Sequence, residues 1–448
     1  MKKLKQFSKL VPCLTLLLLL GMYQPATVIG KSAEYQPEIQ SLVDKVSIEK
    51  MYQHLEELCW ADGHQSRVTF TPGNYKAVEY IEEYFNSLPG ITEVVLDTFY
   101  LSMAITPYDQ YPIINVIATK QGESQTPELI ILGGHYDASG SRESNWATNW
   151  QTLKAQGADD NASGVAAMLE TARIITDPEN NFQNKHTIKF IAFAAEEYHP
   201  KIPGVHHAGS LYDAYAMYDQ QQKLAAVIVL DMIAYNTIKD YVEVISNVKS
   251  LWLADLIYDY VDLYVSDLTT NSYPVNVPYS DHESYQIYGF PAILLMENDS
   301  PWNSDPPNYS RNPHYHTQSD TIGTLRASLL EKVTRLALAS VADLCSQDQI
   351  TYVADNRRSD YSEFSLPSIY PNPFNESTRI RFYVDVDTRV NITIYNMKGE
   401  KITTLSDQLY NYGSHEITWN SQNLASGLYF CVIQSHNFNH CIKITHIK

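Results

Sequence analysis

The sequence predicts an α/β domain with a mixed, mainly parallel sheet flanked by helices, followed by a small C-terminal all-β, immunoglobulin-like sandwich. Three runs rich in Ile, Val, Leu and Phe, at residues 128–132, 187–195 and 225–230, are typical of fully buried strands. Between and after these runs, apolar residues recur with helical spacing. From residue 369 on only short alternating runs occur, which indicates a sandwich.

The first thirty residues have the composition of a secretory signal peptide. Four lysines precede an apolar run at residues 10–22, and small residues follow near Ala26 and Gly30. The run is too short for a comfortable membrane span, and no later stretch approaches the ~20 apolar residues that a span requires. We therefore expect residues 1–30 to be removed and the mature form to lack a membrane span. A retained N-terminal anchor is the alternative.

The chain is acidic, with a formal net charge of −19 at pH 7. The expected signal peptide carries lysines and no Asp or Glu, so its removal makes the mature chain more acidic still. Because nucleic acid is a polyanion, DNA and RNA are not expected as partners. High negative charge is also compatible with simple solubility.

Four cysteines remain after Cys13 leaves with the signal peptide. An even number in an exported chain permits disulfides, but four cysteines allow three pairings. Cys431 and Cys441 flank a predicted hairpin and so are positioned to face each other, whereas buried free thiols are an equally open alternative. The other two, on predicted helices, are Cys59 and Cys345.

The elements of the first domain follow from the periodicity of apolar residues and from the turns between them. Helical spacing predicts helices at residues 48–59, 72–89, 165–175, 251–265 and 325–345. Apolar runs bounded by polar turns predict strands at residues 91–101, 111–119, 127–132, 187–195, 225–230 and 289–295.

Polar residues follow the buried strands at the edge where ligands of parallel sheets collect. A catalytic zinc takes nitrogen and carboxylate ligands and keeps one position open. Two zincs roughly 3.5 to 4 Å apart can share a bridging carboxylate and a bridging water. Five residues of the candidate set suffice for such a pair, which leaves one carboxylate to move protons. The candidates are His135, Asp160, Glu196, Glu197, Asp231 and His316.

These segments resemble the co-catalytic dizinc exopeptidase family, which contains bacterial leucyl aminopeptidases and glutamate carboxypeptidase-like enzymes. The resemblance covers residues 45–345, and all the ligand motifs occur in the family's order. It implies a zinc exopeptidase-like fold in which His135 and Asp231 bind one zinc. Glu197 and His316 would bind the other, and Asp160 would bridge the two ions.

The resemblance also implies roles for residues that do not bind metal. Glu196 matches the family's general base, and Asp137 matches the carboxylate that orients the ligand histidine. Asp281 and His282 match a family segment near the pocket, so we expect them to support the ligands rather than bind metal. The Asp160–Asn161 peptide is expected to be cis, as in the relatives.

Two loops leave alternatives open. The polar segment 138–156 carries Trp146 and Trp150, which either line a substrate subsite or pack a surface loop. After Glu197 the chain departs from the family pattern by inserting residues 198–207, which include three histidines, before Gly209. We expect a loop at the rim of the site rather than a third metal site, because the ligand set is already complete.

A polar stretch at residues 346–367 reads as a linker between the two domains. The expected boundaries are a signal peptide at 1–30, an exopeptidase domain at 31–346, a linker at 347–368 and a sandwich at 369–448.

The sandwich sequence closely resembles the sorting domain that the type IX secretion system recognises. The resemblance rests on the Tyr-Pro-Asn-Pro-Phe-Asn motif at residues 370–375 and on Gly-Leu-Tyr-Phe at residues 427–430. It implies export across a bacterial outer membrane, followed by release or surface attachment. A generic adhesion or substrate-binding module is the alternative.

The expected function is therefore that of a secreted zinc aminopeptidase. It would hydrolyse the N-terminal bond of peptides and proteins through a water bridging two zinc ions, with Glu196 as general base. The alternatives are a glutaminyl cyclase with a single zinc, a carboxypeptidase of the same family, and a receptor-like protein without metals. A count of two metals per chain would distinguish the aminopeptidase from the single-zinc glutaminyl cyclase. Bound zinc would exclude the receptor-like protein.

Overall fold

The computed structural model describes most of both domains. The described residues are 33–60, 63–271, 277–298, 310–348, 350, 368–384, 388–397, 400–410, 413–421, 424–434 and 439–447. The expected signal peptide and most of the expected linker lie outside them. Among the described helices, none combines the length and the apolar character that crossing a bilayer requires.

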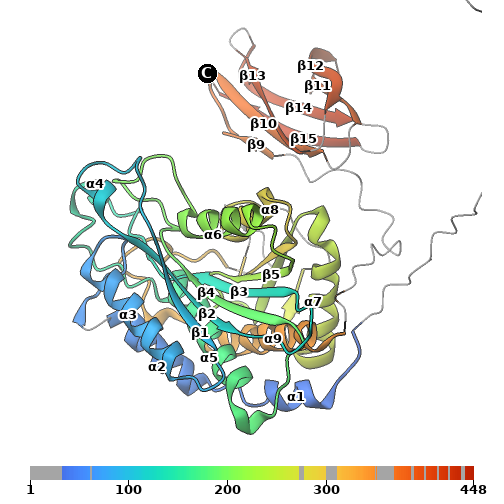
Figure 1. The fold of residues 1–448 in the computed structure, drawn as a ribbon. Coiled ribbons are helices and arrows are strands. Elements are labelled where there is room, and N and C mark those ends of the chain that lie inside the picture. Colours follow the sequence, from blue (N-terminus) through green and yellow to red (C-terminus); the bar gives the residue numbers. More distant parts are fainter. Residues whose placement is uncertain are drawn as a thin grey trace, which may run out of the picture.

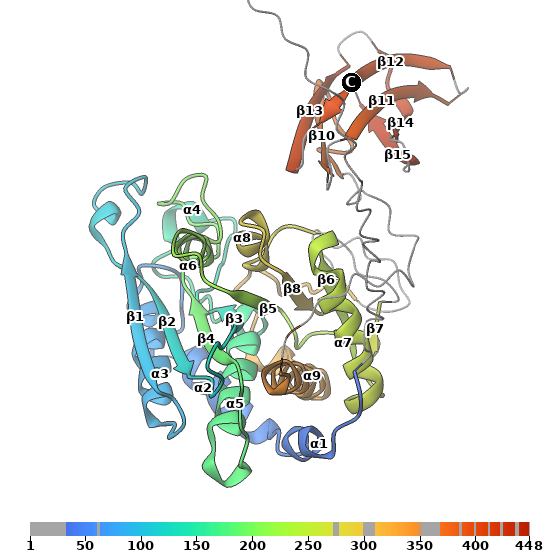
Figure 2. The same ribbon diagram turned by 45° about the vertical axis from the view of Figure 1, so that its right-hand side comes forward.

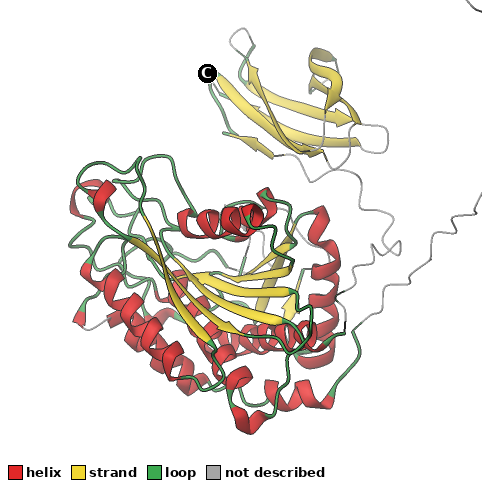
Figure 3. Ribbon diagram, in the orientation of Figure 1, coloured by secondary structure: helices red, strands yellow, loops and turns green. Residues whose placement is uncertain are grey.

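An eight-stranded sheet forms the centre of the first domain (Figures 1 and 3). The strand order across it is β1-β2-β4-β3-β5-β8-β6-β7. The neighbours β4, β3, β5 and β8 run parallel, while the pairs β1–β2, β2–β4 and β6–β8 are antiparallel. The strands are β1 Glu93–Phe99, β2 Ile113–Lys120, β3 Leu129–His135, β4 Thr187–Phe193, β5 Leu224–Leu230, β6 Tyr241–Ser246, β7 Thr269–Thr270 and β8 Ala292–Met296. The predicted mixed, mainly parallel sheet is confirmed.

Helices cover both faces of this sheet (Figures 1 and 2). One face packs against α3, α5, α7 and α9, with α1 lying on α9 and α2 on α3 and α5, and the other face packs against α6 and α8. The helices are α1 Pro37–Val43, α2 Ile48–Trp60, α3 Pro72–Ser87, α4 Trp146–Asn149, α5 Gly164–Thr176, α6 Ala208–Asp219, α7 Leu251–Tyr264, α8 His282–Ile287 and α9 Ala327–Ser346.

The central strands are apolar throughout because both of their faces are covered. Every residue of β3 and β5 is buried. Within β3, Ile130 and Leu132 belong to the core beneath α5 and α9, whereas Ile131 belongs to the core on the opposite face. Alternate residues of a strand point to opposite faces, so a strand covered on both sides reads as one continuous hydrophobic run.

Within the described part of the first domain, six helices and strands lie outside the predicted set, namely α1, α4, α6, α8, β6 and β7. Helix α6 exposes Tyr212, Tyr215 and Tyr218. Because aromatic residues lie on its solvent-facing side as well, its sequence lacks the separation of apolar and polar faces that predicts a helix. Strand β6 is wholly buried but contains Glu243, whose Oε1 accepts a hydrogen bond from the Tyr241 hydroxyl at 2.9 Å. This buried charged residue interrupts the apolar run that would have signalled a strand.

The C-terminal domain consists of two antiparallel sheets with a common core. The sheets have the orders β13-β10-β9 and β12-β11-β14-β15. Ile380 and Trp419 of the first sheet pack with Ile392 and Ile433 of the second. The strands are β9 Ser368–Tyr370, β10 Ser377–Val384, β11 Thr388–Asn396, β12 Lys401–Tyr410, β13 Gly413–Asn420, β14 Gly427–Gln434 and β15 Asn439–His446. The expected sandwich is therefore present.

Asn372 ties the start of this domain to its last strand. Its Nδ2 donates to the carbonyl of Lys443 at 2.9 Å, and its Oδ1 accepts from the backbone N–H of Thr445 at 2.8 Å. The neighbouring Phe374 is buried in the core of the sandwich. The Pro-Asn-Pro-Phe turn thus depends on β15 for its position.

Cys59 and Cys345 are buried free thiols, and Cys431 is also buried. In the pairing of β14 with β15, Cys431 lies opposite Ile442, and Cys441 lies opposite Val432. The register offsets these two cysteines by one position, so they do not form a directly opposed pair.

Candidate metal centre

Three candidate ligands stand at the carboxyl ends of adjacent parallel strands. His135 is the last residue of β3, Glu197 follows β4, and Asp231 follows β5. Because these strands are neighbours in the sheet, their ends meet at one edge. Asp160, from the segment η3 (Ala158–Ser163), and His316, from the loop before η6 (Ile322–Thr324), reach the same edge.

The five candidate ligands form two donor sets that share one carboxylate. His135 Nε2 lies 3.3 Å from Asp160 Oδ1 and 3.4 Å from Asp231 Oδ1. His316 Nε2 lies 3.1 Å from Asp160 Oδ2 and 2.8 Å from Glu197 Oε2. The two oxygens of Asp160 therefore face different sets.

Donor atoms of both sets are buried and have no hydrogen-bond partner. Buried polar atoms are nearly always paired, and an unpaired buried charge is costly. Imidazole nitrogens and carboxylate oxygens together are the ligand chemistry of catalytic zinc. The residues present therefore fit a pair of zinc ions. The unpartnered atoms are His135 Nε2, Asp160 Oδ2, Glu197 Oε1 and Asp231 Oδ1.

Asp137 links two of the ligand segments from a fully buried position. Its Oδ1 lies 3.4 Å from His135 Nδ1 and accepts a hydrogen bond from the backbone N–H of Glu196 at 3.1 Å. Its Oδ2 accepts from the backbone N–H of Glu197 at 3.3 Å and from the Thr69 hydroxyl at 3.1 Å. One carboxylate thus orients both the histidine and the turn that carries the two glutamates.

Asp320 fixes the backbone of the segment that carries Asp160, the carboxylate shared by the two donor sets. Its two oxygens accept hydrogen bonds from the backbone N–H groups of Asp159 at 2.9 Å and Asp160 at 3.1 Å. On the far side, Asn161 Nδ2 donates to the carbonyl of Leu230 at the end of β5, at 2.8 Å. The Asp160–Asn161 peptide is cis, as expected.

Two serines that the sequence did not single out contact candidate ligands. The Ser141 hydroxyl lies 2.8 Å from His316 Nδ1, and the Ser280 hydroxyl donates to Asp231 Oδ2 at 2.8 Å. Ser280 directly precedes the pair expected to support the ligands. In this motif the serine is therefore the residue that contacts a candidate ligand.

Asp281 and His282 are both fully buried near this edge. His282 Nε2 lies 3.0 Å from the carbonyl of Val277, and burial together with His207 lowers the pKa of His282 to about 3. Burial and the carboxylate of Glu196 raise the pKa of Asp281 to about 7. Among the described hydrogen bonds, none joins either residue to a candidate ligand.

The turns that present the ligands have unusual backbone conformations. Ala195, Met232 and His316 have φ angles of 51°, 49° and 58°. Residues with a Cβ rarely adopt this left-handed region, and such strain persists where surrounding contacts impose it. Strained residues at or within two positions of three candidate ligands are consistent with a functional edge of the sheet.

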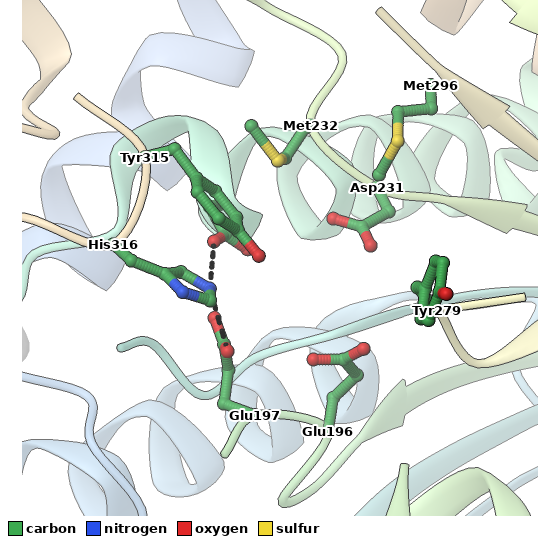
Figure 4. Close-up of a pocket in the computed structure, with 9 residues that line it drawn as sticks. Glu196, Glu197, Asp231, Met232, Tyr279, Met296, Tyr315 and His316 are labelled. Carbon is green, nitrogen blue, oxygen red and sulfur yellow. Dashed lines mark ion pairs between the residues drawn. The ribbon is translucent and has the colours of Figure 1, made fainter. Parts of the chain in front are cut away.

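A pocket opens over the donor sets (Figure 4). Glu196, Glu197, Asp231 and His316 point into it, and two methionines and two tyrosines complete its wall. The ring of Tyr315 stacks on His316 with centroids 3.6 Å apart and planes inclined by 21°. The remaining apolar or aromatic lining residues are Met232, Tyr279 and Met296.

The segment 138–156 reaches the site, but not through its tryptophans. Trp146 and Trp150 are buried and pack against His199, with centroid distances of 6.4 Å and 4.4 Å. Neither lines the pocket, so they pack the loop rather than a substrate subsite. Instead, the backbone N–H of Arg142 donates to the carbonyl of His316 at 3.1 Å, and its guanidinium lies 4.6 Å from the centre of the Tyr315 ring.

The three histidines of the inserted loop point to different places. His199 packs against Phe70 and the two tryptophans of segment 138–156, and His206 is exposed. His207 Nε2 lies 3.1 Å from Glu196 Oε1. Within the described part of the chain, the two groups that can hold a metal include none of them.

The electrostatics of Glu196 and His207 are reciprocal. Burial raises the pKa of Glu196, but His135 and His207 more than offset this, and the net pKa is below the ordinary value of a glutamate. Burial lowers the pKa of His207, but the carboxylate of Glu196 outweighs it and brings the pKa to about 9. Each group thus favours the charged form of the other.

The geometry just described agrees with comparisons to known proteins. Residues 115–341, just over half of the chain, match the model of peptidase family M28, and residues 368–447 match that of a secretion system C-terminal sorting domain. The chain therefore belongs to peptidase family M28. It is a metallo-exopeptidase of the zinc aminopeptidase-like class, and it carries a type IX sorting domain.

Individual relatives cover the first domain. Leucine aminopeptidase 1 of Trichophyton equinum is 26% identical over 338 residues, which are 72% of this chain and 80% of the relative. The Uncharacterized protein YfbL of Escherichia coli (strain K12) is 26% identical over 281 residues, which are 58% of this chain and 76% of the relative.

Solved structures show the same fold. The LapA aminopeptidase of Legionella pneumophila superposes with a TM-score of 0.57 at 19% identity, covering 77% of this chain and 81% of that one. The glutaminyl cyclase of Porphyromonas gingivalis superposes with a TM-score of 0.52 at 20% identity, covering 66% of this chain and 98% of that one. Both aminopeptidases and cyclases thus share the architecture.

Proposed function

We propose that the protein is an exported aminopeptidase that holds two zinc ions and removes residues from the N-termini of peptides and proteins. The observation that carries the proposal is the sharing of Asp160 between two complete donor sets. When bound, a pair of zinc ions activates water and polarises the carbonyl oxygen of a substrate. A single-ion enzyme does not require both sets to be complete.

The roles follow from the donor sets. His135 and Asp231 would hold one ion, and Glu197 and His316 the other, with one oxygen of Asp160 contributed to each. Asp137 and Asp320 would keep these ligands in place through the backbone hydrogen bonds described above. Such supporting contacts fix ligand orientation and affect metal affinity.

Glu196 is the proposed general base. It lines the pocket beside Glu197, yet its Oε1 faces His207 rather than either donor set. Successive side chains of an extended turn point in different directions, so one glutamate can serve a metal while the other faces the substrate. Glu196 would take a proton from the attacking water and deliver it to the leaving amine.

The charge of the pocket favours a substrate N-terminus over a C-terminus. The described residues that line it include four carboxylates and no Lys or Arg. Two zinc ions would neutralise these carboxylates, so the relevant point is that the described lining offers no cationic side chain to pair with the α-carboxylate on which a carboxypeptidase acts. Met232 and Met296 offer an apolar surface beside the carboxylates, which supports a preference for an apolar N-terminal side chain.

Glutaminyl cyclase is the second candidate, because an enzyme of that activity shares the fold. It would use one zinc, and two complete donor sets favour the aminopeptidase. A metal-free receptor is disfavoured by the buried donor atoms that lack partners. Export would begin with removal of residues 1–30, and the type IX machinery would recognise the C-terminal sandwich.

The test is a substrate panel with a metal count. We expect the zinc-loaded protein to contain two zincs per chain and to hydrolyse leucine amide and peptides with free N-termini. The same peptides with acetylated N-termini should not be cleaved. One metal per chain in a fully active preparation, C-terminal release from blocked peptides, or cyclisation of N-terminal glutamine as the main reaction would each refute the proposal.

A further inference from the structure

His207 occupies an unusual position between the inserted loop and the start of α6. It has a left-handed backbone, with φ of 56°, directly before Ala208, the first residue of that helix. Its side chain is 14% exposed, against 9% for Glu196. The insertion thus ends by burying an imidazole against a carboxylate of the pocket.

The backbone around His207 is fixed to the end of β4. Three consecutive N–H groups, those of His207, Ala208 and Gly209, donate at 2.9 Å to the carbonyls of residues 196, 195 and 194. At Gly209 a Cβ would lie 2.3 Å from Asn115 Oδ1, so only glycine allows this approach. Asn115 also donates to the carbonyl of Gly209 at 2.9 Å. The imidazole is therefore held on the segment that carries Glu196.

The ring of His207 faces carboxylates on both sides. Its Nε2 lies 3.1 Å from Glu196 Oε1, and its Nδ1 lies 3.8 Å from Glu283 Oε2. A donor on Nε2 occupies one oxygen of Glu196 and limits rotation of the carboxylate. A carboxylate next to two dications is otherwise attracted into their coordination shell, where it cannot act as a base.

We propose that His207 is a positioning residue that holds Glu196 away from the metals and leaves its second oxygen free to accept a proton. This inference rests on the proposed function, in which Glu196 is the general base. It gives the inserted loop, residues 198–207, a part in catalysis that a simple rim loop would lack.

The first test compares matched substitutions in the zinc-loaded, full-length protein, with leucine amide as substrate. For His207→Leu we expect kcat to fall about tenfold or more, because a hydrogen bond to a charged group is lost, with KM within about twofold and two zincs retained. His207→Gln keeps a donor and should recover most of kcat. His206→Leu changes an exposed histidine of the same loop and should leave both parameters unchanged.

A double variant separates positioning from other roles. If His207 acts only through Glu196, then Glu196→Gln combined with His207→Leu has the same kcat as Glu196→Gln alone. A further drop in the double variant would mean that His207 contacts the substrate itself, and loss of zinc in His207→Leu would mean a structural role. Either result overturns the inference, as does a normal kcat in His207→Leu.

The outcomes also distinguish this inference from the proposed function. If His207→Leu is fully active while Glu196→Gln is inactive, only the role of His207 is wrong. If the unaltered protein does not hydrolyse leucine amide, or if Glu196→Gln is fully active, the proposed function itself is wrong.

Discussion

The carboxylate of Asp137 accepts a hydrogen bond from the backbone N–H of Glu196, at 3.1 Å, from a fully buried position. The side chain that lies beside the histidine of one donor set thus also fixes the turn that presents the proposed base. Disturbing this one carboxylate should affect metal affinity and turnover together.

Asp137→Asn is the variant that tests this link. An amide has one acceptor oxygen where Asp137 uses two, and its NH₂ would face a backbone donor. We expect kcat/KM to fall about tenfold to a hundredfold and zinc to bind more weakly, as is typical when such a supporting contact is lost. Titration with a zinc chelator and steady-state kinetics measure both effects. A change in kcat/KM with unaltered zinc affinity would show that the two are not coupled.

The adjacent glutamates should respond differently to the same change. Glu196→Gln is expected to keep both zincs, keep KM within a few-fold, and lower kcat about a hundredfold or more, because general acid–base catalysis contributes roughly 10²- to 10⁴-fold. Glu197→Gln should instead lose or weaken one zinc. Elemental analysis and kinetics on both variants provide the comparison, and zinc loss in Glu196→Gln would reverse the assignment.

Asp160 offers a test of the shared carboxylate. Because its two oxygens face different donor sets, Asp160→Asn should weaken both zincs, whereas Asp231→Asn should weaken only one. Metal content after dialysis against increasing chelator gives the two affinities. If Asp160→Asn retains one zinc with unaltered affinity, Asp160 does not bridge.

A buried acid remote from the donor sets should give the first domain a pH dependence of its own. The Tyr285 hydroxyl donates to Asp213 Oδ2 at 2.5 Å, and burial raises the pKa of Asp213 to about 6. The unfolded pKa is ~3.9, so the folded state binds the proton more tightly. Ionisation of Asp213 therefore lowers the free energy of unfolding as the pH rises from about 4 through about 6, by up to about 3 kcal/mol.

Asp213→Asn removes this ionisation while keeping an acceptor for the tyrosine. We expect the variant to gain stability relative to the unaltered protein above pH ~6, but not below pH ~4. Calorimetric unfolding of the first domain across this range measures the difference. Asp219→Asn, an exposed position on the same helix, serves as control. Parallel stability profiles for Asp213→Asn and the unaltered protein would contradict the expectation.

The sandwich should matter for export and not for catalysis. A chain ending at residue 348 is expected to keep kcat/KM within about twofold, since the candidate ligands and the described pocket residues precede that point. In the producing cell, the same chain should stay inside the outer membrane. Asn372→Ala, which removes the two hydrogen bonds to β15, should impair export of the full chain without changing its activity. An inactive but folded truncated chain would refute this division.

The parallel centre of the sheet was predictable because burial on both faces leaves a continuous apolar run, as in β3 and β5. The meeting of His135 with Asp231 also follows from their places at neighbouring strand ends. The contact of Ser141 with His316, and of His207 with Glu196, lies in loops without periodicity. Such contacts depend on tertiary packing, which no local pattern encodes.

The two donor sets collect side chains from separate segments that begin at residue 135 and end at residue 316. Ions bound there would act as cross-links that close long loops of chain in a domain whose Cys59 and Cys345 are free thiols. An unfolded chain cannot offer this geometry, so the free energy of metal binding adds to that of folding. The proposed zinc pair would then stabilise the fold of the domain as well as support catalysis. Removing the zinc would therefore lower the stability of the domain at the same time as it abolishes activity.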